Sequence, residues 1–278
     1  MNRIKKQTDN NEYIFSNNLW IRNFTKNNPY KDINKTYKEE DYFIFLQNET
    51  KNCLSKYPWI ETENFNYEKI IIVSDGYNFL EKQKLLENIN KNVCIIGVNN
   101  VLNKWNLSKN INFYIVNNPY SECMKYFPRK NKNLPKCIAS TKTNWEFLSN
   151  YKGNIYKYCP VNEENYKSTI SKEVTFQIND YRNPICAAIQ LAYNFGVEKL
   201  LLFCCDNSFN QKKDGAIKLE NELYQYPQHK IAEEIIDANL YWLKSLPYYN
   251  IEIKDHSSGS IYKNAEYIKE EEILSFLN

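Results

Sequence analysis

Several short apolar segments of this sequence end in polar residues of the kinds that bind ligands. Asparagine side chains offer neutral donors and acceptors that can contact a base, a ribose or a sugar hydroxyl without a metal. A glycine allows a ligand to approach the backbone, and a helix that follows it attracts phosphate. Each set could instead form an ordinary turn, with Asp75 capping a helix. The candidate ligand-binding residues are Ser74, Asp75 and Gly76; Asn99 and Asn100; Asn117 and Asn118; Ser140 and Thr141; and Asn207.

Arg182 precedes the clearest helix start in the chain. Asn183 suits the N-cap and Pro184 the first helical position. A guanidinium beside a helix N-terminus can hold a phosphate through two hydrogen bonds, so Arg182 is a catalytic candidate and Asn183 a ligand-binding one. The alternative is a capping arrangement in which Arg182 pairs with Asp180.

Asp206 and His229 complete the catalytic candidates. Asp206 ends the most apolar segment, where a carboxylate needs a partner or a ligand such as a ribose, a substrate hydroxyl or a divalent ion. A turn with the next two residues is the alternative. His229 lies near a helix start, where the helix dipole favours a neutral imidazole suited to a general base. We expect His256 in a surface loop, and no Ser stands in a G-x-S-x-G turn.

The elements that must position these residues alternate along the chain. β-Branched and apolar runs predict strands, and apolar residues at helical spacing predict helices between them. This alternation favours an α/β, Rossmann-like fold with a mostly parallel sheet flanked by helices, in which ligands bind at the carboxyl ends of the strands. The predicted strands are 69–73, 93–98, 112–116, 136–139, 154–158, 200–205 and 251–253, and the predicted helices are 79–89, 184–195, 228–245 and 270–277.

Residues 1–66 differ from the rest, because they hold scattered aromatic residues and no glycine. We interpret them as a mainly helical N-terminal extension. We expect residues 67–278 to form the Rossmann-like domain that carries the candidate site residues.

Bulk composition limits the possible partners and location. A net charge of +3, from 36 basic and 33 acidic residues, argues against nucleic-acid binding. The longest apolar run, 200–205, is far too short to span a membrane, and no apolar segment typical of a secretory signal follows the basic start. None of the eight cysteines forms a CxxC pair, so we expect reduced thiols in a cytoplasmic protein. The oligomeric state is not predicted.

The segment Arg182–Phe209, RNPICAAIQLAYNFGVEKLLLFCCDNSF, resembles a helix–strand signature of two related groups. One is the MptE-like group, which includes 6-hydroxymethylpterin pyrophosphokinases and motility accessory factors. The other is the bacterial sialyltransferase family that uses CMP-sialic acid, which the chain also resembles at Asn99, Tyr114–Pro119 and His229. The resemblance covers roughly residues 68–268 and implies a Rossmann-type fold that handles a nucleotide.

We therefore expect a nucleotide-dependent transferase, most like a metal-independent glycosyltransferase of the sialyltransferase type. The co-substrate would be a nucleotide or nucleotide-sugar, with no firm cofactor and an unknown acceptor. In this interpretation Arg182 holds the phosphate, Asp206 the ribose or acceptor, and His229 takes the acceptor proton. One alternative is an MptE-like pyrophosphokinase acting on a hydroxymethylpterin with Mg²⁺ and ATP, with Asp75 and Asp206 as metal ligands. Another is a non-catalytic nucleotide-binding protein.

Overall fold

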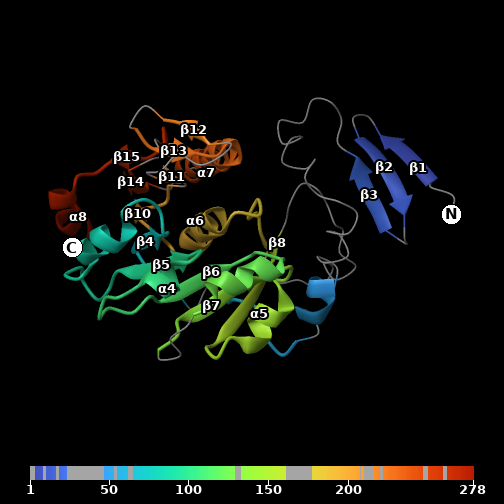
Figure 1. Ribbon diagram of the computed structural model, residues 1–278, viewed down its shortest axis with the longest axis horizontal. Helices are drawn as coiled ribbons and strands as arrows, with labels where there is room; N and C mark the ends of the chain where they lie inside the picture. The colour runs from blue at the N-terminus through green and yellow to red at the C-terminus, as the bar shows by residue number, and fades with distance from the viewer. Residues whose placement is uncertain are drawn as a thin grey trace.

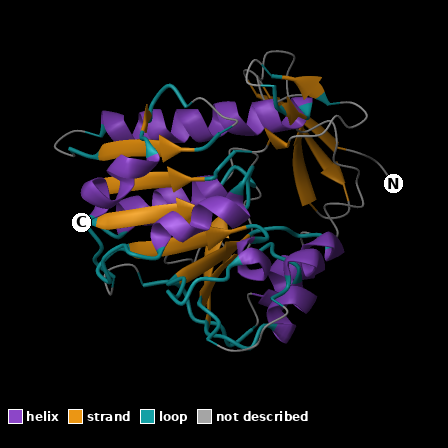
Figure 2. Cartoon of the chain, turned by 60° about the vertical axis from the view of Figure 1, so that its left-hand side comes forward, coloured by secondary structure: helices purple, strands orange, loops and turns teal. Residues whose placement is uncertain are grey.

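A computed structural model describes most of the chain around a nine-stranded sheet in which every pairing is parallel (Figures 1 and 2). The described residues are 4–8, 11–16, 19–23, 47–52, 55–61, 65–128, 133–160, 177–206, 208–209, 216–219, 222–246, 250–258 and 262–278. The sheet order is β15-β14-β10-β4-β5-β6-β7-β8-β9. Its strands are β4 Lys69–Val73, β5 Cys94–Val98, β6 Phe113–Val116, β7 Lys136–Ser140, β8 Ile155–Pro160, β9 Gln177–Ile178, β10 Lys199–Phe203, β14 Glu252–His256 and β15 Glu266–Tyr267.

The central strands form where apolar runs can be buried on both faces of the sheet. Ile70–Val73 of β4 and Leu200–Phe203 of β10 are fully buried. This is the environment that favours β-branched and leucine-rich strands in parallel sheets. The Rossmann-like fold and its seven predicted strands are confirmed, with ends that differ by a few residues.

Helices cover both faces of this sheet. They are α3 Phe79–Lys82, α4 Val101–Lys104, α5 Trp145–Asn150, α6 Pro184–Asn194, α7 Pro227–Ser245 and α8 Glu270–Leu277, with 3-10 helices η2 Gln83–Leu86 and η3 Ser121–Tyr126. The predicted helix 79–89 is wrong in part, because a short α-helix passes into a 3-10 turn and ends at Leu86. The start of α6 is confirmed, since the Asn183 side chain accepts a hydrogen bond from the Ile185 N–H at 2.8 Å.

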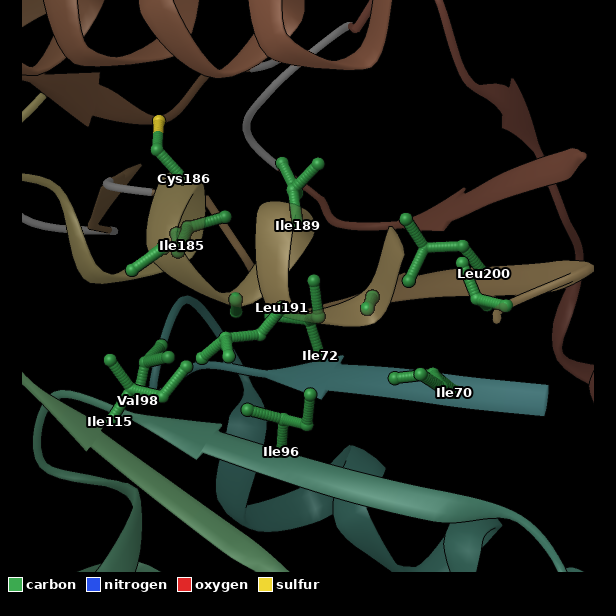
Figure 3. Packing of buried hydrophobic residues seen from close by; sticks show 14 of the residues in the cluster. Ile70, Ile72, Ile96, Val98, Ile115, Ile185, Cys186, Ile189, Leu191 and Leu200 are labelled. Atoms are coloured by element: carbon green, nitrogen blue, oxygen red, sulfur yellow. The ribbon is translucent and has the colours of Figure 1, made fainter. Parts of the chain in front are cut away.

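Helix α6 is the centre of the largest apolar cluster (Figure 3). Its Leu191 faces strand residues such as Ile72 and Ile96, while Cys186 points away from the sheet (Figure 3). Asn239 of α7 donates a hydrogen bond to the Cys186 sulfur at 3.6 Å. Helix α6 is therefore packed between the sheet and α7, which fixes the segment that precedes it.

The N-terminal region departs from the expected helical extension. Strands β1 Ile4–Thr8, β2 Asn11–Ser16 and β3 Leu19–Asn23 form an antiparallel sheet. The mainly helical expectation is thus wrong for residues 4–23. Their aromatic and β-branched residues favour strands. Residues 47–52 are helical.

His256 is not in a surface loop but is the last residue of β14, 1% exposed, because the strand continues past Ile253 to pair with β10. Seven cysteines are described, and all are buried and free of disulfides; Cys53 lies outside the described residues. None of the helices that the structure describes is long and apolar enough to cross a membrane. Strands β11 Ser208–Phe209, β12 Ile217–Lys218 and β13 Tyr224–Gln225 form a separate small sheet.

Candidate functional site

A pocket of about 250 Å³ opens at the carboxyl ends of β5, β6, β7 and β8. Five of the residues predicted from the sequence line it: Asn99, Asn117, Asn118, Ser140 and Arg182. The other lining residues are Tyr114, Ile115, Val116, Pro119, Tyr120, Tyr126, Lys142, Pro160, Asp180 and Pro184. Amide, aromatic and cationic side chains thus meet in one concave surface, which we call the strand-end pocket.

Two cationic side chains belong to the strand-end pocket. Arg182 precedes α6 and Lys142 follows β7. Burial lowers the pKa of Lys142, and the positive charge of Arg182 lowers it further, while Glu49 acts in the opposite direction. The charge of Asp180, which also lines the pocket, raises the pKa of Lys142 as well. The pocket therefore presents two cations and one carboxylate to a ligand.

Asp180 shapes the wall that carries Arg182. Its Oδ2 accepts hydrogen bonds from the Tyr158 hydroxyl at 2.7 Å and from the Asn117 amide at 3.2 Å. Its Oδ1 accepts from the Arg182 N–H at 2.9 Å, and its carbonyl accepts from the Asn183 N–H at 2.7 Å. Burial raises the pKa of the Tyr158 hydroxyl, and the Asp180 charge raises it further. Asp180 is therefore held by β6 and β8 and in turn holds the turn before α6.

This turn has an uncommon backbone. Tyr181 and Arg182 both adopt the left-handed region, with φ of 45° and 58°. Bulky residues with positive φ are rare and are retained where the surroundings over-determine them, often at binding sites. The bonds to Asp180 supply that constraint, so the placement of Arg182 is built into the fold.

The three asparagines of the strand-end pocket are oriented but not saturated. Asn99 donates to the Ser74 hydroxyl at 3.2 Å, and Asn118 Oδ1 accepts from the Tyr120 N–H at 2.9 Å. Asn117 is oriented by Asp180. A carboxamide has two donor hydrogens and an oxygen with two lone pairs, so each keeps capacity for a ligand.

The residues after β4 and β10 contact one another and are not among those that line this pocket. The Gly76 N–H donates to the Cys204 carbonyl at 3.1 Å. Asp206 Oδ1 accepts from the Tyr77 N–H at 2.9 Å and from the Ser208 hydroxyl at 2.9 Å, and Oδ2 accepts from the Ser258 N–H at 3.1 Å. The structure therefore gives Asp206 a role in joining loops.

None of the remaining predicted residues that the structure describes lines the strand-end pocket. Asp75 pairs with Lys104 at 2.9 Å, and its Oδ1 lies 3.4 Å from the Asn100 N–H. Thr141 is 1% exposed, and its hydroxyl has no hydrogen-bond partner among the described residues. Asn183 caps α6, as described above. Asn207 lies outside the described residues.

His229 lies in the first turn of α7 and is not among the residues that line the strand-end pocket. Its ring packs edge-on against Tyr226, with centroids 5.4 Å apart. Because α7 connects the carboxyl end of β10 to the amino end of the parallel strand β14, it begins on the carboxyl side of the sheet. His229 therefore shares that side with the pocket.

Sequence reasoning missed Lys142 and the contribution of residues 47–52. Lys142 comes one residue after the predicted pair Ser140 and Thr141. The prediction included only the residues that directly follow each strand, so it did not include Lys142. Asn52 donates to the carbonyls of Thr141 and Thr143 at 2.9 and 2.7 Å. Asn48 donates to those of Pro119 and Lys142 at 2.8 and 3.2 Å. The helical residues 47–52 thus brace the loops that form the pocket.

Comparison with known proteins supports the fold. The MAf glycosyltransferase from Magnetospirillum magneticum AMB-1 has a similar structure, with a TM-score of 0.64 and 12% sequence identity. The match covers 91% of this chain and 44% of the other, so the chain spans less than half of that protein. The chain therefore shares an α/β fold with this glycosyltransferase. No protein-family model and no curated protein matches the sequence.

Proposed function

We propose that the chain is a nucleotide-dependent transferase, most like a metal-independent glycosyltransferase of the sialyltransferase type. The observation that carries the proposal is the strand-end pocket, where Asn99, Asn117 and Asn118 face the same space as Lys142 and Arg182. Amides suit a base and ribose, and two cations suit a phosphate. The glycosyltransferase-like fold adds support.

In the proposed reaction an acceptor hydroxyl attacks the anomeric carbon of the donor sugar. The bond between that carbon and the phosphate oxygen breaks, and the nucleotide leaves with the electron pair. Lys142 and Arg182 stabilise the phosphate charge that develops. His229 takes the proton of the acceptor hydroxyl. The function of Asp206 is to hold the loops on which this arrangement depends.

The Mg²⁺-dependent pyrophosphokinase fits the chain less well. It needs Asp75 and Asp206 as metal ligands. Both oxygens of Asp206 already accept protein hydrogen bonds, and Asp75 is paired with Lys104. A metal would have to displace these donors, so we favour the metal-independent transferase over the pyrophosphokinase.

Ligand screening tests the proposal directly. Thermal unfolding of the full chain is followed with CMP, CMP-sialic acid, UDP-sugars, ATP, and ATP with Mg²⁺. A ligand that binds only the folded state raises Tm in proportion to the logarithm of its concentration over Kd. We expect a nucleotide-sugar or its nucleotide product to raise Tm without added metal. Stabilisation by none of them would contradict the proposal, and stabilisation by ATP only with Mg²⁺ would favour the pyrophosphokinase.

Two variants locate the nucleotide in the strand-end pocket. Lys142→Met and Arg182→Gln should each weaken its binding about tenfold or more, because a hydrogen bond to a charged group contributes about 1.5–3 kcal/mol. Lys152→Met is the matched control. Lys152 is exposed and precedes β8, so it lies at the amino ends of the strands, opposite the pocket. Calorimetric titration measures the three dissociation constants. Equal weakening by the control would argue against the assignment.

The role of His229 is tested by turnover. His229→Ala should lower the rate of sugar transfer by a factor of about 100 or more while the nucleotide still binds, as expected for loss of a general base. Full transfer activity in this variant would remove His229 from the mechanism. Tight binding without turnover in the unaltered chain would favour the non-catalytic nucleotide-binding protein.

A further inference from the structure

A second pocket of about 250 Å³ lies between α6, α7 and the residues that follow β9. It is lined by Asn179, Tyr181, Gln190, Ile235, Ala238, Asn239 and Trp242. We call it the inter-helix pocket. Helices α6 and α7 pack directly on each other, with α7 running over α6 on one face of the sheet (Figure 1).

The inter-helix pocket shares one wall with the strand-end pocket but is separate from it. Asn179 and Tyr181 line the inter-helix pocket, whereas Asp180 and Arg182 line the strand-end pocket. Successive residues of one short segment therefore alternate between the two. The proposed transfer reaction does not use the inter-helix pocket.

A connected set of carboxamides forms its polar side. Gln190 Oε1 accepts from the Asn179 N–H at 3.1 Å, and Gln190 Nε2 donates to Asn239 Oδ1 at 3.1 Å. Asn239 is 4% exposed and donates to the Ile235 carbonyl at 3.0 Å. These bonds fix the amide planes of Gln190 and Asn239 before any ligand arrives, which lowers the entropy cost of binding.

One polar atom of this set is left over. Asn179 Oδ1 is buried and has no hydrogen-bond donor among the described residues. Buried side-chain oxygens are normally satisfied, and leaving one without a donor is unfavourable. A hydroxyl group is a suitable partner, because it can donate to an amide oxygen and also accept from an amide N–H.

The other side of the inter-helix pocket is apolar. Ile235 and the Trp242 ring contribute to it, and Trp242 is 37% exposed with its ring held edge-on against Tyr193, 5.5 Å between centroids. Of the described residues that line this pocket, none carries a charge. A charged ligand would lose hydration without gaining a counter-charge, and a wholly apolar ligand would leave Asn179 unsatisfied.

We propose that the inter-helix pocket binds a small neutral polyhydroxylated ligand, such as a monosaccharide. Its C–H face would pack on Trp242, and its hydroxyls would bond to the carboxamide of Gln190. Asn179 Oδ1, which is buried in the free protein, would accept a hydroxyl once the side chain turns toward the pocket. The proposal does not depend on the function of the strand-end pocket, because the two have different linings.

Saturation-transfer NMR on the full chain tests this with glucose, galactose, N-acetylglucosamine and myo-inositol as probes, and glucose 6-phosphate as the charged comparison. We expect at least one neutral probe to bind saturably and the phosphate to bind more weakly. Saturable binding of none of the four neutral probes, with water alone satisfying Asn179, would overturn the proposal. Equal or tighter binding of glucose 6-phosphate would also overturn it.

Variants place the bound probe. Asn179→Ala should weaken it about three- to tenfold, the effect of one lost hydrogen bond. Ala238→Phe should abolish binding by filling the space, and it should fold normally because Ala238 is exposed on α7. Asn150→Ala, at an exposed position on α5, and Lys142→Met, in the strand-end pocket, should leave probe binding unchanged. Undiminished binding in Ala238→Phe would show that the probe binds elsewhere.

Discussion

The backbone of Gly76 packs directly against Asp206. A Cβ added to Gly76 would lie 2.8 Å from Asp206 Oδ1 and 2.4 Å from the Cys204 carbonyl oxygen. The same Asp206 carboxylate accepts hydrogen bonds from the loops that follow β4 and β14. These loops meet where the strand order of the sheet reverses, between β4 and β10. Gly76 therefore allows the loop after β4 to approach the loop after β10 closely.

Gly76→Ala should destabilise the fold for this reason. Its methyl group would meet the backbone carbonyls of Cys204 and Asp206, at 2.4 and 2.7 Å, and the Cys204 carbonyl accepts the hydrogen bond of the Gly76 N–H. Overpacking of this kind costs about 1–3 kcal/mol of unfolding free energy. Urea unfolding measures the loss. Tyr77→Phe, which keeps the N–H that bonds to Asp206, is the control and should change stability by less than about 0.5 kcal/mol. A neutral Gly76→Ala would contradict the packing described here.

The sequence predicted the sheet well because each central strand is indicated by residues that are adjacent in the chain. Segments such as Ile70–Val73 and Leu200–Phe203 are apolar throughout, and only a strand buried on both faces suits them. Asn183 and Pro184 marked the start of α6 through their own backbone preferences. Strands β1–β3 were missed because the scattered aromatic residues of this region were interpreted as part of a mainly helical extension.

The site was predicted less well because its contacts are distant in sequence. Polar residues follow every strand, and the pattern is the same whether they bind a ligand or join loops. Asp206 bonds to the N–H of Tyr77, 129 positions away, and only the fold shows that this carboxylate is engaged. Lys142 enters the strand-end pocket from just beyond β7, and Asn52 reaches its loops from 89 positions away.

Asp255 should make stability depend on pH. It is 3% exposed, and burial raises its pKa from 3.8 to about 8, with the nearby Asp206 charge adding to the shift. Since the pKa of Asp255 is higher in the folded than in the unfolded state, its protonated carboxyl group contributes to stability. This contribution to the free energy of unfolding is fully present below about pH 4 and is lost as the pH rises to about 8. Burial lowers the pKa of the neighbouring His256, which acts in the opposite direction.

Asp255→Asn isolates the contribution of the carboxyl group. The amide oxygen can still accept the bond from the Ser257 hydroxyl, 2.6 Å in length, but the side chain no longer ionises. Urea unfolding at pH 5, 6, 7 and 8 should show the variant gaining stability relative to the unaltered chain as pH rises. The difference should reach the order of a few kcal/mol. Parallel stability curves for the two proteins would show that Asp255 is ionised in the fold.

Tyr158 should control the strand-end pocket without lining it. Its hydroxyl donates to Asp180 Oδ2 at 2.7 Å, both side chains are buried, and Asp180 in turn holds the N–H of Arg182. Tyr158→Phe leaves the buried carboxylate short of a donor, which should cost about 1–3 kcal/mol of unfolding free energy. It should also weaken nucleotide binding, because the turn that presents Arg182 loses its support.

Tyr151→Phe separates these two effects. The Tyr151 hydroxyl is also buried and donates to the Pro135 carbonyl at 2.8 Å. Both residues precede strands, so this bond lies at the amino ends of the strands, away from the strand-end pocket. Both variants should lose stability in urea unfolding, whereas only Tyr158→Phe should raise the Kd of the nucleotide found by thermal-shift screening. If the two variants bound it equally well, Asp180 would support the fold alone and would not position Arg182 for a ligand.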